Sequence, residues 1–226
     1  MKKTPVVLIV GDIHYPLHDT RAVQAAYDYG KKLKPDVLVM GGDLVDFSAI
    51  SRFLHNPRKV PSVQKELDGG RTLLSMFSDV AQERVFVAGN HEERLEKFLL
   101  RNAPQLLDLR CLDLREALGM KSWQYVPYPA FWKQGRLIVH HGISYNNTTN
   151  QKNLAKFGGY NVAQGHSHRL SQTFHRSLQG QVSAVEWGTL SDLNPDYCHR
   201  PDWTQGFAVY ANGDLSLRRI SQGLVV

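Results

Sequence analysis

One pattern constrains the fold more than any other: a short run of apolar residues that ends abruptly in glycine and then an acid. Val6–Val10 leads into Gly11-Asp12. Val37–Met40 leads in the same way into Gly41-Gly42-Asp43. Because four or more consecutive apolar residues leave no polar face, each run predicts a strand buried on both sides. The acids should therefore lie at the carboxyl edge of a sheet, where α/β proteins gather their ligand sites.

Three later segments repeat the pattern with amide and imidazole side chains after the apolar run. They are Arg84–Ala88 before Gly89-Asn90-His91, Arg136–Val139 before His140-His141-Gly142, and Tyr160–Gln164 before Gly165-His166-Ser167-His168. Together with His14, which follows the first apolar run, six of the ten histidines fall at the ends of predicted strands. Oxygen and imidazole donors with no cysteine nearby favour Mn, Fe, Ni, Zn or Mg over a softer ion. The pattern predicts a divalent metal site.

The spacing within these motifs adds an expectation about side-chain direction. Asp12 and His14 are two residues apart, so in extended backbone they project to the same side and can grip one ion. The two histidines of Gly165–His168 have the same spacing and can serve adjacent metals. His140 and His141 alternate faces, so only one of them can point into a site. The residues alone leave that choice open.

The connecting segments indicate a mixed α/β fold. Arg21–Leu33 has helical spacing between the first two strands, and a strand, helix and strand in this order predict parallel pairing. Ser62–Ser78 is also helical in pattern, although Gly69-Gly70 indicates either a kink or a close packing contact. From Gln172 to Ile220 the chain alternates apolar and polar residues, which predicts antiparallel strands with a hairpin turn at Asn212-Gly213.

Composition bounds the remaining possibilities. With 226 residues, 42% of them hydrophobic, the chain fits one domain over residues 1–226. No apolar stretch approaches the ~20 residues of a membrane-spanning helix, and two cysteines form no disulfide framework. We therefore expect a cytoplasmic protein with no membrane partner. The net charge of +6 agrees with an anionic partner such as nucleic acid or a nucleotide.

A basic segment follows the second strand-end motif. Arg52, His55 and Arg58 lie within twelve residues of Asp46 along the chain, just beyond the predicted site. Guanidinium groups bind phosphate through paired hydrogen bonds, so we interpret these three residues as a clamp for substrate phosphate. A solvated turn is the alternative.

The ordered series Asp-x-His, Gly-Asp-x-x-Asp, Gly-Asn-His-Glu, His-Gly and Gly-His-x-His spans residues 11 to 168. In this order it resembles the calcineurin-like metallophosphoesterase superfamily. The resemblance implies an α/β fold of two mixed β-sheets packed as a sandwich and flanked by helices, with the site at the strand ends.

The resemblance also implies a role for each motif residue. One metal would be held by Asp12, His14 and His168, and the other by Asn90, His141 and His166, with Asp43 bridging the two. His91 would stay off the metals and act on the phosphoryl oxygens or the leaving group, with an acidic neighbour setting its state. Asp46 is counted with His91 as catalytic.

The implied reaction is hydrolysis of a phosphate ester by a hydroxide that bridges two divalent ions, with manganese the first choice. Protein phosphatases of the superfamily carry Arg-Gly after the last acid of the second motif, where this chain has Phe47-Ser48. They also have Gly where this chain has Tyr15. Both differences weigh against a protein phosphatase. The Asp-x-His and Gly-His-x-His forms resemble instead the phosphodiesterase and nuclease branches of the superfamily, which implies a substrate among nucleotides or nucleic acid. The alternatives are a phosphomonoesterase or protein phosphatase, a scaffold without catalysis, and a nucleic-acid binder.

Overall fold

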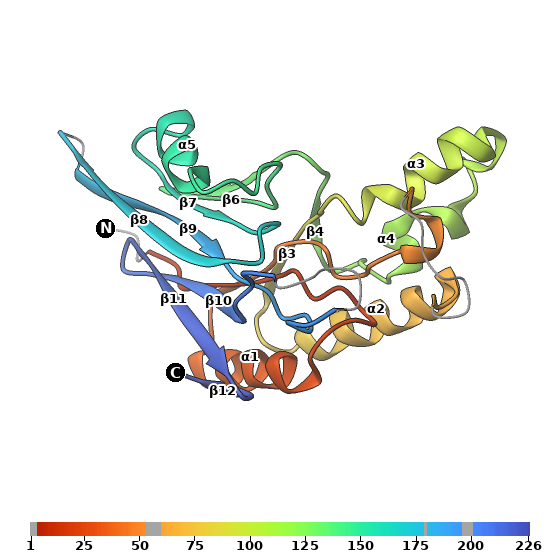
Figure 1. Cartoon of the computed structure of the whole chain (residues 1–226), viewed down its shortest axis with the longest axis horizontal. Helices are drawn as coiled ribbons and strands as arrows, with labels where there is room; N and C mark the ends of the chain where they lie inside the picture. Colours follow the sequence, from red (N-terminus) through yellow and green to blue (C-terminus); the bar gives the residue numbers. More distant parts are fainter. Residues whose placement is uncertain (1–3, 53–59, 179, 196–200) are drawn as a thin grey trace.

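Two mixed β-sheets packed face to face form the centre of the molecule (Figure 1). The computed structural model describes residues 4–52, 60–178, 180–195 and 201–226. The seven-stranded sheet has the order β12-β11-β10-β1-β2-β3-β4 and the five-stranded sheet the order β5-β6-β7-β9-β8. The strands of the first sheet are β1 (Val7–Val10), β2 (Val37–Met40), β3 (Glu83–Val87), β4 (Gln124–Val126), β10 (Gly206–Ala211), β11 (Asp214–Ser221) and β12 (Leu224–Val225). Those of the second are β5 (Trp132–Gln134), β6 (Leu137–His140), β7 (Asn161–Gln164), β8 (Leu170–Ser177) and β9 (Gly180–Trp187).

Helices cover the outer faces of both sheets, which confirms the predicted fold class (Figure 1). Helices α1 (Thr20–Leu33) and α2 (Val63–Phe77) pack on the seven-stranded sheet, and α5 (Thr149–Lys156) packs on the other. The short helix η1 (Ser48–Ile50) follows the β2 loop. Helix α3 (Glu93–Asn102), η2 (Pro104–Leu106), η3 (Arg110–Leu112) and α4 (Leu114–Ala117) form a group at one end of the molecule. No helix of the described ranges is long and apolar enough to span a bilayer.

The continuous apolar runs are explained by burial on both faces. In β1, Val7 and Ile9 belong to the core between the two sheets, while Leu8 and Val10 pack toward the helices. All four side chains are fully buried. Strand β1 pairs in parallel with β2, as the strand, helix, strand order predicted. The carboxyl ends of β1, β2 and β3 therefore lie at one edge of the sheet.

Helix α2 runs unbroken through the Gly69-Gly70 pair. A Cβ atom on Gly69 would lie 2.1 Å from the ring of Tyr15, and one on Gly70 would lie 2.7 Å from Cγ1 of Val45. The pair therefore marks a close packing contact rather than a kink. Because Tyr15 and Val45 belong to the loops after β1 and β2, this contact holds α2 directly against the loops that carry the strand-end acids.

The C-terminal region is antiparallel, as predicted. Strands β10 and β11 form a hairpin whose turn residues, Asn212 and Gly213, both have positive φ, at 54° and 86°. Positive φ at both turn positions is the geometry that favours Asn-Gly in tight hairpins. Strand β10 then pairs with β1 and completes the seven-stranded sheet.

Candidate metal centre

The loops after five strands bring acids and histidines together in three overlapping groups. In each group, one donor atom from every residue lies within 4.8 Å of the others. The groups are Asp12, His14 and His168; His14, Asp43 and His91; and Asp43, His141 and His166. His14 and Asp43 each belong to two groups, so the clusters form one continuous set of donors around Asp43.

Most of these donors sit on unusual backbone. Five of the seven predicted metal ligands have φ between 48° and 70°, a left-handed conformation that non-glycine residues rarely adopt. They are Asp12, His14, Asp43, His166 and His168. The expectation that paired donors face one side because their backbone is extended is therefore wrong. Tight left-handed turns aim them instead, and such conformations, at about 1–3 kcal/mol each, gather at functional sites.

The first group holds two imidazole nitrogens against each other. Nε2 of His14 lies 3.0 Å from Nε2 of His168, which lies 3.3 Å from Oδ1 of Asp12. Two ligand atoms at ~2.1 Å from a shared ion stand about 3 Å apart when they occupy neighbouring coordination positions. The indole Nε1 of Trp187 donates to Oδ2 of Asp12 at 2.7 Å and so orients this carboxylate from behind.

The second group centres on His141 and Asp43. Nδ1 of His141 donates to the carbonyl oxygen of Gly41 at 2.8 Å, which turns Nε2 toward Oδ2 of Asp43 at 3.2 Å. Burial would lower the pKa of His141, but the Asp43 carboxylate outweighs it and raises that pKa to about 10. Burial and the neighbouring His141 lower the pKa of His166 to about 4, so His166 is neutral and its lone pair is available near pH 7.

The structure distinguishes the two adjacent histidines at the end of β6. His141 lies beside Asp43, whereas the ring of His140 lies 5.5 Å from that of Phe157 on the α5 side of the sheet. Burial, followed by repulsion from Lys156, lowers the pKa of His140 to about 4. Of the alternatives that the sequence left open, His141 is the one placed among the candidate ligands.

Two features indicate that this donor set fits a divalent cation. Oδ1 of Asn90 and Nε2 of His141 are buried without a hydrogen bond of acceptable geometry to any described residue. A Cβ atom on Gly89 would lie 2.1 Å from Oδ1 of Asp43, and one on Gly165 would lie 2.3 Å from Oδ2 of Asp12. The glycines therefore let backbone approach both carboxylates, and the unpaired atoms match the oxygen and nitrogen ligands of Mn, Fe, Zn or Mg.

His91 lies at the edge of the cluster, with 13% of its side chain exposed. Its Nδ1 lies 2.9 Å from the carbonyl oxygen of Asp46 and 3.2 Å from Oδ1 of the same residue. Burial would lower the pKa of His91, but Asp43 and Asp46 outweigh it and raise the pKa. Nη2 of Arg94 approaches Nε2 of His91 at 2.9 Å, a hydrogen bond that requires Nε2 to be unprotonated. Protonation of His91 and this Arg94 contact therefore exclude each other.

Two buried glutamates hold the loop after β2 from behind. Oε2 of Glu92 accepts hydrogen bonds from the backbone N–H groups of Asp43 and Gly89, at 2.8 and 2.7 Å. Its Oε1 accepts one from Leu44 at 2.9 Å. Glu66 on α2 accepts the backbone N–H of Phe47. Through these backbone hydrogen bonds the glutamates fix the loop that carries Asp43 and Asp46.

Sequence reasoning missed four of these supporting side chains. Glu92 lies within the Gly-Asn-His-Glu motif, so a signal for it was present, and Arg94 follows His91 by three residues. Nothing in the sequence pointed to Glu66 or Trp187. Of the predicted phosphate clamp, Arg52 lines a cavity that reaches Asn90, while His55 and Arg58 lie outside the described residues.

Comparisons with known proteins agree with this fold. The gene 54 protein of Mycobacterium phage L5 is 24% identical over 222 residues, covering 90% of this chain and 87% of that protein. Vacuolar Protein Sorting 29 from Cryptosporidium parvum superposes with a TM-score of 0.55 at 13% identity, covering 100% of this chain and 96% of that one. YfcE, a phosphoesterase from E. coli, superposes with a TM-score of 0.52 at 15% identity, covering 98% and 96%.

At these identities the solved structures establish a shared fold and no more. The family assignment depends instead on the model of the calcineurin-like phosphoesterases, which matches residues 5–217. Members of this family bind divalent metals, in agreement with the donor groups around Asp43. Because the match covers nearly the whole chain, this protein belongs to the calcineurin-like phosphoesterase family.

Proposed function

We propose that the protein hydrolyses phosphodiesters of nucleotides or nucleic acid with the help of two divalent metal ions. The observation that carries the proposal is the arrangement of donor groups on either side of Asp43. Asp12, His14 and His168 would hold one ion, and Asn90, His141 and His166 the other, with Asp43 shared. Separate groups that share one carboxylate suit a two-ion site better than a single ion.

Bound ions of this kind act as Lewis acids at phosphorus and lower the pKa of a coordinated water. The protein's own groups prepare the site for them. Burial would raise the pKa of Asp43, but His141 and His91 outweigh it and hold that pKa well below its usual range, so the shared carboxylate stays ionised. Burial would likewise raise the pKa of Asp46, and hydrogen bonds from His14 and His91 keep it low.

His91 is the group we assign to the reacting phosphate. It is partly exposed, lies 3.7 Å from Oδ2 of Asp43, and has its Nδ1 held by Asp46. Its Nε2 can donate a proton to the leaving oxygen as the P–O bond breaks, while water supplies the new P–O bond. Arg94, already hydrogen-bonded to that nitrogen, can move to a phosphoryl oxygen when His91 is protonated.

A metal and substrate panel tests the proposal. The purified protein is analysed for bound metals and then assayed with manganese or magnesium on bis-p-nitrophenyl phosphate, p-nitrophenyl phosphate, cyclic nucleotides and DNA. We expect faster hydrolysis of the diester than of the monoester, and loss of activity with EDTA. Faster monoester hydrolysis would reassign the protein as a phosphomonoesterase. Bound metal without turnover of any substrate would make it a scaffold.

A further inference from the structure

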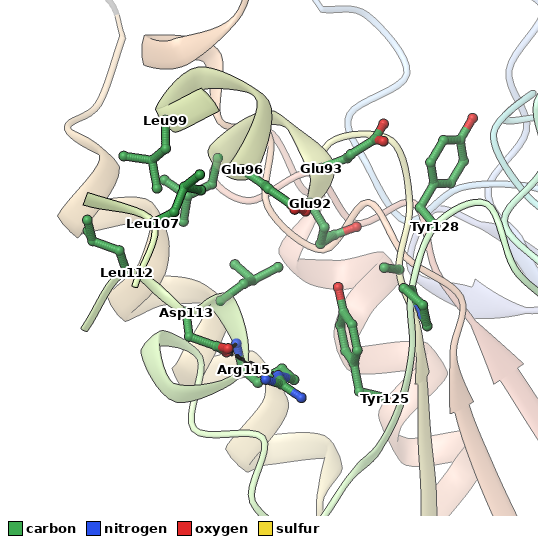
Figure 2. A pocket seen from close by; sticks show the side chains of 14 residues that line it. Glu92, Glu93, Glu96, Leu99, Leu107, Leu112, Asp113, Arg115, Tyr125 and Tyr128 are labelled. Carbon is green, nitrogen blue, oxygen red and sulfur yellow. Dashed lines mark hydrogen bonds and ion pairs between the residues drawn. The ribbon is translucent and has the colours of Figure 1, made fainter. Parts of the chain in front are cut away.

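Two cavities flank helix α3, and they differ in charge. The first has a volume of about 400 Å³, lies between η1 and α3, and reaches the candidate ligand Asn90. The second has a volume of about 310 Å³ and lies against η3, α4 and β4 on the other side of the helix (Figure 2). Only the first is lined by both Asn90 and Arg94, so it continues directly from the proposed catalytic site.

The first cavity is basic. Of the described residues that line it, four are cationic and one is acidic: Arg52, Arg94, Lys97 and Arg101 against Glu93. Glu93 pairs with Lys97 across one helical turn, and both side chains are partly exposed, so this ion pair is weak. The cavity keeps a net positive charge beside the site where a phosphate would be cleaved.

The second cavity does not share this excess of positive charge. Among its described lining residues are the carboxylates of Glu92, Glu93, Glu96 and Asp113 (Figure 2). Its cation, Arg115, is paired with Asp113 at 2.7 Å. Glu93 lines both cavities and pairs with Lys97, so this side of α3 lacks the net positive charge that would attract a phosphate chain on the other side.

Helical spacing places the cations of α3 in a row. Arg94, Lys97 and Arg101 follow the i, i+3, i+7 pattern of one helix face, while Leu95 and Leu99 on the opposite face are buried. At 1.5 Å per residue the row extends about 10 Å. We call Arg94, Lys97 and Arg101 the basic face of α3. A row of this length matches a chain of phosphates better than a single phosphate.

An exposed aromatic ring interrupts the basic face. Phe98 lies between Lys97 and Arg101, lines the same cavity, and is 38% exposed. Exposed rings beside a cationic groove are the surfaces on which nucleic-acid bases stack. Resting on the proposed function, we propose that the basic face of α3 and Phe98 bind the substrate beyond its scissile phosphate, and that this portion is a nucleotide carrying at least one further phosphate.

A binding experiment on the metal-free protein tests this subsite without using catalysis. The affinity of a fluorescein-labelled oligothymidylate is measured by anisotropy over a range of salt concentrations, for the wild type and Lys97→Ala/Arg101→Ala. Each phosphate contact to a single strand contributes about 0.7 to the slope of log affinity against log salt, so the double variant should lower the slope by about 1.4. Phe98→Ala should weaken binding about tenfold while keeping the slope.

The matched control removes one lysine and one arginine charge from another part of the surface. Lys121→Ala/Arg219→Ala changes two exposed cations that line neither cavity, and should keep the wild-type slope. Equal slopes for the wild type and the Lys97→Ala/Arg101→Ala variant would overturn the proposal. So would an equal loss in the control variant, because the effect would then be one of overall charge.

Turnover identifies the source of the further phosphate. With manganese, kcat/KM is measured for oligothymidylate and for diadenosine tetraphosphate, and each value is divided by kcat/KM for bis-p-nitrophenyl phosphate. In the Lys97→Ala/Arg101→Ala variant, at least one of these two ratios should fall at least about tenfold. A fall with oligothymidylate indicates a nucleic-acid strand, and one with diadenosine tetraphosphate indicates a nucleoside polyphosphate. An unchanged ratio for both contradicts the subsite. If the wild type hydrolyses no diester, the proposed function fails, and the binding result still decides the subsite.

Discussion

Five buried carboxylates lie in the loop after β2 or close to it, and they form two sets that behave differently. We call Asp12, Asp43 and Asp46 the histidine-facing acids and Glu66 and Glu92 the amide-facing acids. All five are nearly or fully buried, yet histidines keep the pKa values of the first set low. Burial raises the pKa of Glu66 to about 7, and burial with the nearby Asp43 raises that of Glu92. The partner of a buried acid, not burial itself, decides its charge.

This difference divides the work of the site. The histidine-facing acids are ionised, so their oxygens are available to a cation, and we expect changes to them to affect metal binding and catalysis. The amide-facing acids bind backbone N–H groups of the same loop and hold it in place, so changes to them should affect stability first. Substitutions in each set can separate the two roles.

The largest expected effect is that of Asp43→Asn. The substitution removes the negative charge that two donor groups share. It keeps an oxygen that can accept the hydrogen bond from the backbone N–H of His91. We expect kcat/KM for bis-p-nitrophenyl phosphate to fall by at least about 10³-fold, with an unchanged circular dichroism spectrum. Wild-type activity in this variant would show that Asp43 is not a ligand.

His91→Ala should have the next largest effect. Loss of a general acid lowers kcat by about 10²–10⁴-fold, and because we place His91 off the metals, bound metal measured by mass spectrometry should be retained. His175→Ala, on the exposed part of β8, is the matched control and should leave kcat unchanged. If His91→Ala also lost its metal while remaining folded, His91 would be a ligand instead.

Glu92→Gln should mainly reduce stability. The glutamine side chain has one acceptor oxygen, so at least one of the three backbone N–H groups now bound by Glu92 loses its partner. We expect the free energy of unfolding to fall by about 3 kcal/mol in urea titrations. Glu116→Gln, at an exposed position, should stay within about 0.5 kcal/mol of the wild type. Equal stability of both variants would contradict the holding role of Glu92.

Glu66→Gln should change how stability depends on pH. The folded-state pKa of Glu66 is raised to about 7 from an ordinary 4.5, so the folded protein binds this proton more tightly than the unfolded chain. Its contribution to stability is therefore greatest at low pH and declines as pH rises from 4.5 to 7. The free energy of unfolding of the wild type, relative to that of the variant, should therefore fall by about 2 kcal/mol between about pH 5 and pH 7. A constant difference in unfolding free energy over this range would mean that Glu66 does not titrate there.

Much of the fold and most of the donor set could be predicted from the sequence, because both depend on local patterns. Continuous apolar runs marked the buried strands β1 and β2, and the Asn-Gly pair marked the β10–β11 hairpin. The motifs after the strands gave the candidate ligands in chain order. Parallel strands place their carboxyl ends along one edge of a sheet, so the residues after β1, β2 and β3 had to come near each other, as did those after β6 and β7. The packing of the two sheets then brought the two sets together.

The tertiary structure decided what depends on distant parts of the chain. Trp187 hydrogen-bonds Asp12 across 175 positions, and Glu66 reaches Phe47 from a helix whose pattern shows only a core face. The left-handed backbone at Asp43 and the choice of His141 over His140 also required packed neighbours. The sequence by itself determined which donors exist and which strands carry them. Only packing decided where they point and which are charged, because direction and desolvation depend on contacts that local spacing does not encode.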